Sequence, residues 1–143
     1  MERKKLLAQL PDILRSRLPP QLGSFETILA GRLLKVHYGD PAFHYEVWFH
    51  EGKGLVEVAY HGEGSAAANR LLLDRLVARL VDIKESLGPT VELEPWVRSW
   101  VRLYRMLPAG SGRVLRAETL AGELAGMIVV VQPIVADLVS VEA

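Results

Sequence analysis

His37, His44 and His61 lie near one another in the chain, and two of them are followed two residues later by a glutamate. The repeated spacing is His44-x-Glu46 and His61-x-Glu63. Three imidazoles on neighbouring strands can hold a divalent metal with one position open, and a nearby carboxylate can serve as ligand or general base. We therefore consider a metal site at His37, His44, His61 and Glu46. The competing interpretation is that these residues line the polar, solvated face of a half-covered sheet.

Two strands of alternating apolar residues must position this row. Residues 43–50 and 56–60 both alternate, and Gly52-Lys53 forms the turn between them. The apolar residues then face one another in three pairs: Tyr45 with Tyr60, Val47 with Val58, and Phe49 with Val56. The same register puts His44 opposite His61 on the other face, because side chains alternate with period two.

A preceding strand, predicted over residues 31–38, supplies the third histidine. The turn at residues 39–42 predicts four cross-strand pairs: Leu34 with Val47, Lys35 with Glu46, Val36 with Tyr45, and His37 with His44. The three histidines would then form one row across three adjacent strands, with Glu46 and Glu63 diagonally beside it.

Helical periodicity and end signals predict three helices around these strands. The first covers residues 2–18 and ends at Pro19-Pro20. The second covers residues 65–87, with Ser65 as its N-cap and Gly88-Pro89 as its end. The third covers residues 115–139. Residues 127–131 are β-branched enough to form a strand instead, but the length of the apolar pattern favours helix.

Further alternation at residues 91–94 and 100–106 predicts two more strands. The order is helix, three strands, helix, two strands, helix, in a single domain over residues 1–143. This predicts an α+β fold: one largely antiparallel five-stranded sheet with helices packed on one face. In element order the chain resembles the secretion-chaperone type of fold, shared by effector chaperones and some other bacterial proteins. The resemblance covers most of the chain, concerns element order alone, and implies a chaperone-like, protein-binding module.

Aromatic and arginine residues gather around the second predicted hairpin: Trp96, Arg98, Trp100, Arg102 and Tyr104. Such residues are enriched at interaction hot spots, so this cluster is a candidate protein-interaction surface. Alternatively, one face of the hairpin belongs to the core and neighbouring glutamates neutralise the arginines, with Glu92 facing Arg102 across the ladder.

Two other motifs are weaker. Residues 62–67 (GEGSAA) follow a strand and open a helix, as in a dinucleotide fingerprint, but the antiparallel hairpin and the charge of Glu63 favour a capped turn. The acids Asp40 and Glu57 resemble those of restriction-type nucleases. That family has a lysine two positions later, where this chain has Ala59.

The composition narrows the function classes further. The 143 residues include 17 basic and 17 acidic ones, so no global field favours nucleic acid or an anionic membrane. Cysteine is absent, which excludes thiolate metal sites and cysteine nucleophiles. The longest apolar run, residues 125–136, is shorter than the roughly 20 residues of a membrane span. We expect a cytoplasmic, non-enzymatic interaction or adaptor domain that forms homodimers. The alternative is a metal-binding protein or metal-dependent enzyme; no other cofactor is expected.

Overall fold

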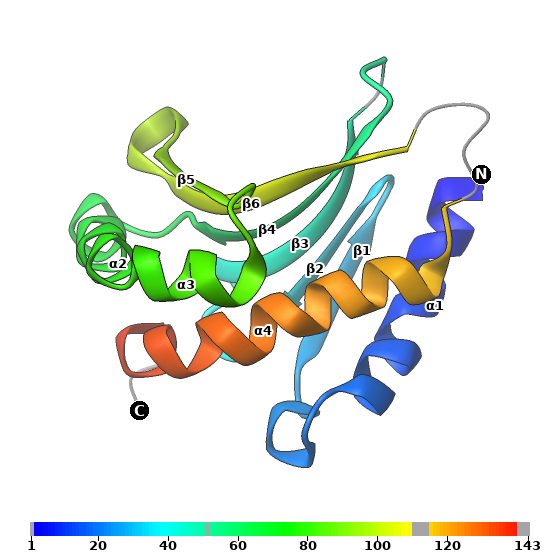
Figure 1. Cartoon of the computed structure of the whole chain (residues 1–143), viewed down its shortest axis with the longest axis horizontal. Helices are drawn as coiled ribbons and strands as arrows, with labels where there is room; N and C mark the ends of the chain where they lie inside the picture. The colour runs from blue at the N-terminus through cyan, green and yellow to red at the C-terminus, as the bar shows by residue number, and fades with distance from the viewer. Residues whose placement is uncertain (1, 51, 110–114, 140–143) are drawn as a thin grey trace.

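A single six-stranded antiparallel sheet forms one layer of the protein, in the order β1-β2-β3-β4-β6-β5 (Figure 1). The computed structural model describes residues 2–50, 52–109 and 115–139. The strands are β1 (Glu26–Ala30), β2 (Leu33–His37), β3 (Phe43–His50), β4 (Leu55–Gly62), β5 (Glu92–Pro95) and β6 (Val101–Pro108).

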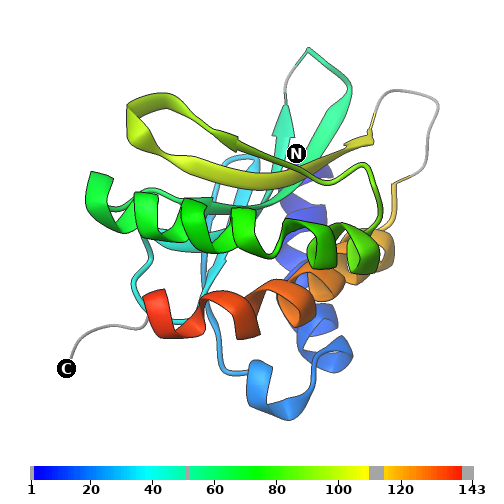
Figure 2. The ribbon, with the colours of Figure 1, turned by 60° about the vertical axis from the view of Figure 1, so that its left-hand side comes forward.

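The second layer consists of four helices: α1 (Glu2–Arg17), α2 (Ala66–Ala78), α3 (Leu80–Leu87) and α4 (Ala117–Val139). Helix α4 contacts β3 and β4 directly and packs beside α1, while α2 and α3 pack on α4 (Figures 1 and 2). Two short 3-10 helices, η1 (Pro20–Leu22) and η2 (Val97–Ser99), complete the described elements. All four α-helices lie on the same side of the sheet, and no α-helix of the described residues covers its other side (Figure 2).

The predicted fold class is confirmed, with one strand more than expected. The additional strand is β1, which pairs with β2 at the edge of the sheet. All five of its side chains are exposed, so no alternation of buried and exposed residues marks it in the sequence. It is held by backbone pairing, which leaves little trace in residue type.

The helices also differ in detail from the prediction. The helix expected over residues 65–87 is divided at Arg79, whose backbone (φ −111°, ψ 9°) separates α2 from α3. Residues 127–131, the segment with strand-like composition, lie inside α4 as predicted. Ser65 is the N-cap of α2, since its Oγ accepts the Ala68 N–H at 3.1 Å.

The core lies between the helices and the apolar face of the sheet. Its fully buried aliphatic members on the two terminal helices are Leu7, Leu10, Leu14, Leu120, Leu124, Ile128, Val131 and Val135. They meet Tyr45 and Tyr60, whose rings lie 4.6 Å apart on β3 and β4. The Tyr45 hydroxyl donates to Oε1 of Gln132 at 2.8 Å, whereas the buried Tyr60 hydroxyl has no partner among the described residues. Both tyrosine rings therefore lie in the core, but of the two hydroxyls only that of Tyr45 is hydrogen-bonded within the described residues.

Helix α4 contains the one stretch among the described residues, Ala117–Leu138, that is long and apolar enough to cross a membrane. The core helix of a globular protein passes the same test. In this fold 56% of its most apolar window is buried inside the protein, against α1 and the sheet. The absence of a membrane partner and the cytoplasmic location remain predictions.

Candidate metal centre on the polar face of the sheet

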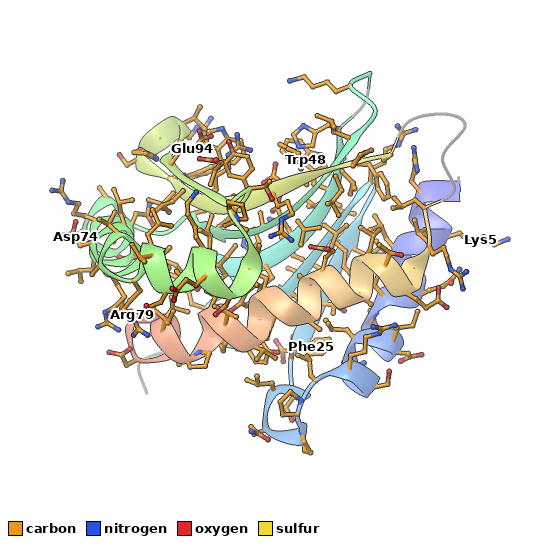
Figure 3. The ribbon with its side chains drawn as sticks, viewed as in Figure 1. Lys5, Phe25, Trp48, Asp74, Arg79 and Glu94 are labelled. Atoms are coloured by element: carbon orange, nitrogen blue, oxygen red, sulfur yellow. The ribbon has the colours of Figure 1, made fainter. Side chains whose placement is uncertain are left out.

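The strand register that brings the histidines together is the predicted one. In the β3–β4 ladder His44 lies opposite His61 and Trp48 opposite Glu57. In the β2–β3 ladder Lys35 lies opposite Glu46. These side chains share the face of the sheet opposite the four α-helices, and Trp48 is seen projecting away from those helices (Figure 3).

His37 is not part of the cluster, which corrects the predicted row. The β2–β3 ladder ends at the pair Val36–Tyr45, so His37 has no partner on β3. Its Nδ1 lies 3.0 Å from the Gly39 carbonyl oxygen, and its Nε2 lies 3.9 Å from Oε1 of Glu26 on β1. The end of the strand turns this imidazole toward the edge of the sheet instead of toward His44.

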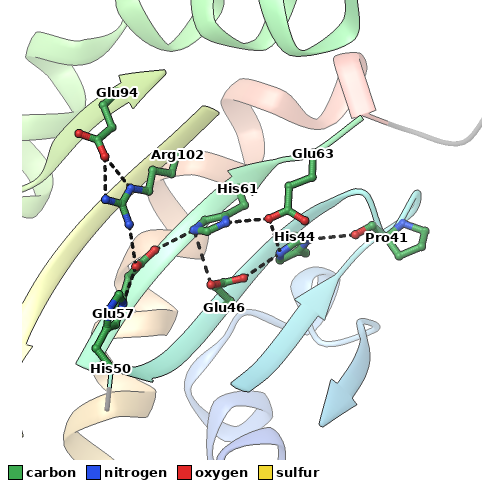
Figure 4. A network of polar contacts seen from close by, with 9 residues as sticks. All are labelled: Pro41, His44, Glu46, His50, Glu57, His61, Glu63, Glu94 and Arg102. Atoms are coloured by element: carbon green, nitrogen blue, oxygen red, sulfur yellow. Dashed lines mark hydrogen bonds and ion pairs between the residues drawn. The ribbon is translucent and has the colours of Figure 1, made fainter. Parts of the chain in front are cut away.

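Four side chains converge in its place: His44, Glu46, His61 and Glu63 (Figure 4). One ligand atom from each lies within 4.8 Å of the others. Three of the four side chains are at most 3% exposed, and that of Glu63 is 17% exposed. Burial of so many ionisable groups is costly unless each is paired, so the arrangement requires an internal partner for every one of them.

Hydrogen bonding to the backbone fixes which nitrogen of His44 faces the carboxylates. Nδ1 lies 2.9 Å from the Pro41 carbonyl oxygen, which can only accept, so Nδ1 carries the proton. Nε2 therefore points at Oε1 of Glu46, 2.9 Å away, and at Oε2 of Glu63, 3.9 Å away. A histidine that donates one nitrogen to a carbonyl and presents the other to carboxylates has the arrangement of a metal ligand with its outer partner in place.

His61 lies between carboxylates at both ring nitrogens. Its Nε2 is 2.7 Å from Oε2 of Glu57, and its Nδ1 is 3.0 Å from Oε2 of Glu63. Burial alone would lower the pKa of His61, but hydrogen bonds to Glu57 and Glu63 and the charge of Glu46 outweigh it and raise the pKa to about 9. Without metal, His61 is therefore an imidazolium at neutral pH.

Glu57 supports His61 from outside the cluster. Its side chain is fully buried and holds His50 and Arg102, each at 2.9 Å from Oε1. Burial would raise the pKa of Glu57, but hydrogen bonds from His61 and His50 and the charge of Arg102 lower it. Glu57 thus stays a carboxylate and orients the His61 ring, in the way that outer carboxylates orient zinc-bound histidines. From the sequence, Glu57 was of interest only for its resemblance to an acid of restriction-type nucleases, and its role beside His61 was not predicted.

The second hairpin covers the cluster, so the face expected to be solvated is largely buried. Trp96, just after β5, places its ring 5.0 Å from the His61 ring and 6.4 Å from the Trp48 ring. Trp100 continues this wall at 6.0 Å from Trp96. A pocket of about 240 Å³ remains between the tryptophans and the cluster.

The five residues predicted as an interaction surface do not form one surface, because they have different surroundings. Trp96 and Trp100 line the pocket. The Arg102 guanidinium lies 4.7 Å from the Trp96 ring and 4.0 Å from the Tyr104 ring, and it pairs with Glu94 at 2.7 Å. Arg98 is exposed at the hairpin tip. Glu94, not Glu92, lies opposite Arg102, since Glu92 pairs with Tyr104.

The glycine loop forms a capped turn between β4 and α2. Asn69 of α2 is buried and its side chain bonds both the N–H and the carbonyl of Gly64, at 2.9 and 3.1 Å. The Gly64 amide is therefore occupied. A Cβ at Gly64 would lie 2.7 Å from the Phe43 ring, so the glycine is needed for close packing.

Comparison with protein-family models, with curated proteins and with solved structures finds no match. The function has to be inferred from the cluster itself.

Proposed function

We propose that the protein binds a divalent transition metal, with Zn²⁺ as the best-fitting ion. The ligands are Nε2 of His44, Nδ1 of His61, and one oxygen each of Glu46 and Glu63. The observation that carries the proposal is the convergence of four ligand atoms within 4.8 Å, with an outer hydrogen-bond partner on each histidine. Tetrahedral zinc places neighbouring nitrogen and oxygen ligands roughly 3.4 Å apart. The contacts of 2.9, 3.0 and 3.9 Å within the cluster bracket that separation.

The donor set favours zinc over the hard cations. Mg²⁺ and Ca²⁺ prefer six or more oxygen ligands and retain water, whereas two imidazoles with two carboxylates suit a borderline ion. Two negative carboxylates also neutralise the ion's charge, which a buried site requires.

A metal titration with two matched histidine variants tests this proposal. Protein freed of metal by a chelator should take up one Zn²⁺ per chain, measured by calorimetry and elemental analysis. His44→Ala removes a ligand and should abolish stoichiometric binding. His37→Ala removes the histidine that lies outside the cluster and should bind zinc like the original protein. Circular dichroism of both variants checks that they fold.

Two results would reject the metal site: no stoichiometric zinc uptake by the original protein, or equal loss of binding in both variants. Co²⁺ provides an independent reading. Its visible absorption should have the intensity of a four-coordinate ion, and that intensity should disappear in His44→Ala.

A second candidate function is a homodimeric interaction module that pairs through the edge strand β1. All five β1 side chains are exposed, and Ile28 and Leu29 are 45% and 37% exposed. β1 lies at the edge of the sheet with no further strand beside it in the described chain, and such an edge is a ready template for a strand of another molecule. Light scattering tests it: a dimer that becomes monomeric in Ile28→Lys supports pairing at β1, and a monomer at high concentration rejects it.

A further inference from the structure

The two outer strands of the sheet differ in how well they are protected against pairing with another chain. At one edge, β5 is only four residues long, two of them are glutamates, and it ends in Pro95, which supplies no N–H. At the other edge, β1 contains neither proline nor lysine, and all five of its residues are exposed. Pairing with a second strand is therefore favoured at β1 and disfavoured at β5.

This difference determines which strand a second copy of the chain can offer. A contact between β1 of one copy and β5 of the next would be head-to-tail and could continue into a filament, but the proline and the carboxylates of β5 oppose it. A contact between the two β1 strands closes on itself, because it uses the open edge of both copies. The edges of this sheet therefore favour a closed dimer.

The hairpin of β1 and β2 fixes which backbone groups of β1 point outward. Residues 31–32 form a two-residue turn, so Ala30 and Leu33, which flank it, are a hydrogen-bonded pair. Hydrogen-bonded and non-hydrogen-bonded pairs alternate along an antiparallel ladder, so the N–H and C=O groups of Thr27 and Leu29 face away from β2. A further strand must bond to these two residues.

An antiparallel register centred on Ile28 satisfies both of them and pairs all five residues of each strand. Thr27 of one copy lies opposite Leu29 of the other and exchanges both backbone bonds with it, while the two exposed Ile28 side chains meet. Charge favours the same direction. Antiparallel pairing puts Glu26 opposite Ala30, whereas parallel pairing in register would set two Glu26 carboxylates side by side.

We propose that two copies of the chain pair through β1 in this antiparallel register, with Ile28 on the two-fold axis. The inference rests on the dimer proposed at β1, whose residue contacts it assigns, and it is independent of the metal. The axis runs perpendicular to the sheet, so the two sheets continue one another and their polar faces lie on the same side. The candidate metal centres of both copies therefore belong to one shared surface.

Disulfide trapping tests the register, because the chain has no cysteine and an introduced one is its only thiol. Ile28→Cys should convert most of the protein into a covalent dimer under mild oxidation. Opposite residues of a non-hydrogen-bonded pair have Cα atoms about 4.5 Å apart, which a disulfide spans. Glu26→Cys is the matched control on the same face of the strand. Its two copies would lie roughly 14 Å apart, so it should stay monomeric on a non-reducing gel.

A mixture of two variants gives an independent measurement of the register. Glu26→Cys and Ala30→Cys should cross-link with each other when mixed, because the register puts these two positions opposite one another. Neither variant should cross-link when it is oxidised alone. Mass spectrometry of the cross-linked peptides identifies the joined positions.

Sedimentation of the unsubstituted protein and of Ile28→Lys separates two kinds of failure. A monomer at high concentration, or a dimer that persists in Ile28→Lys, overturns the β1 interface and the register together. A dimer that becomes monomeric in Ile28→Lys, but whose Ile28→Cys and Glu26→Cys variants cross-link equally, overturns only the register.

Discussion

His61 is the residue on which the polar network converges, because its two nitrogens face Glu57 and Glu63 and its edge meets Trp96. The same ring serves two states. As an imidazolium it neutralises buried carboxylates, and as a neutral imidazole it can present Nδ1 to a metal. Proton and metal therefore compete for one atom, which couples the site to pH.

Stability of the metal-free protein should fall on both sides of a mildly acidic optimum. Burial opposes the charge on His61, but its carboxylate partners raise the pKa from 6.5 to about 9, so its contribution is complete below 6.5 and is lost as pH rises through about 9. Burial likewise opposes the charges on Glu57 and Glu63, but their pKa values lie below 4.5, chiefly because His61 donates to them. Their contribution is present above 4.5 and is lost as pH falls through the lowered values.

Urea unfolding with excess chelator at a series of pH values measures this profile. His61→Gln, which keeps a donor but cannot titrate, should flatten the alkaline limb. If the original protein and this variant lose stability equally between neutral pH and pH 9, His61 does not carry the effect.

Replacement of each core tyrosine by phenylalanine gives a matched pair of variants that differ in the hydrogen bonding of the lost hydroxyl. Tyr60→Phe removes a buried hydroxyl that has no partner among the described residues, so we expect the free energy of unfolding to rise by about 1 kcal/mol. Tyr45→Phe leaves Oε1 of Gln132 without its donor and should lower that free energy by about 1–3 kcal/mol. Denaturant unfolding of both variants measures these changes in the free energy of unfolding. Equal destabilisation by both would contradict the assigned difference in hydrogen bonding.

The elements show where sequence reasoning succeeds and where it cannot. The register of β2, β3 and β4 could be predicted because one face is apolar, and a one-residue slip would expose it. Strand β1 could not be predicted, since its side chains are all exposed and only its backbone is fixed. The break at Arg79 lies within an uninterrupted helical pattern.

The site was predictable to the same extent. Alternation brought His44, Glu46 and His61 to one face with Glu63 beside them, as the cluster has it. The exclusion of His37 depends on where the β2–β3 ladder stops, and a strand end is poorly marked in sequence. Burial of the row depends on Trp96, which reaches it from a hairpin far along the chain. No local pattern records that contact.

Close packing of the loop between β4 and α2 against the Phe43 ring on β3 depends on glycine at position 64. Gly64→Ala would place a Cβ 2.7 and 3.0 Å from two atoms of the Phe43 ring, so we expect destabilisation of about 1–3 kcal/mol in thermal or denaturant unfolding. Gly23→Ala is the control, because its backbone (φ −86°, ψ −9°) suits alanine and the nearest atom is 3.4 Å away. That variant should be neutral or slightly more stable. Comparable losses in both would exclude the Phe43 contact as the cause.

At the scale of the whole molecule, a network of ion pairs links neighbouring strands on the polar face of the sheet. The helices link the strands on the opposite, apolar face. It runs from Glu46 on β3 through His61 and Glu57 on β4 to Arg102 on β6 and Glu94 on β5 (Figure 4). A metal at its centre would bind the folded chain far better than the unfolded one.

Zinc should therefore raise the unfolding temperature of the whole protein. At free zinc 100 times the dissociation constant, binding contributes about 2.7 kcal/mol, which for a domain of this size corresponds to roughly 10 °C. Differential scanning calorimetry with and without chelator measures the shift. His44→Ala should show none, and an equal shift in that variant would place the stabilising zinc somewhere else.

The pairing of α1 with α4 has a consequence for the order in which the chain can fold during synthesis. Leu7, Leu10 and Leu14 are synthesised more than 100 residues before most of α4, the helix that packs beside them. Even the Arg3 side chain binds the carbonyl of Ala109, 106 positions later. While the ribosome is still producing the sheet, the apolar side of α1 has no permanent cover. A nascent chain halted before residue 117 should therefore remain sensitive to protease and available to general chaperones.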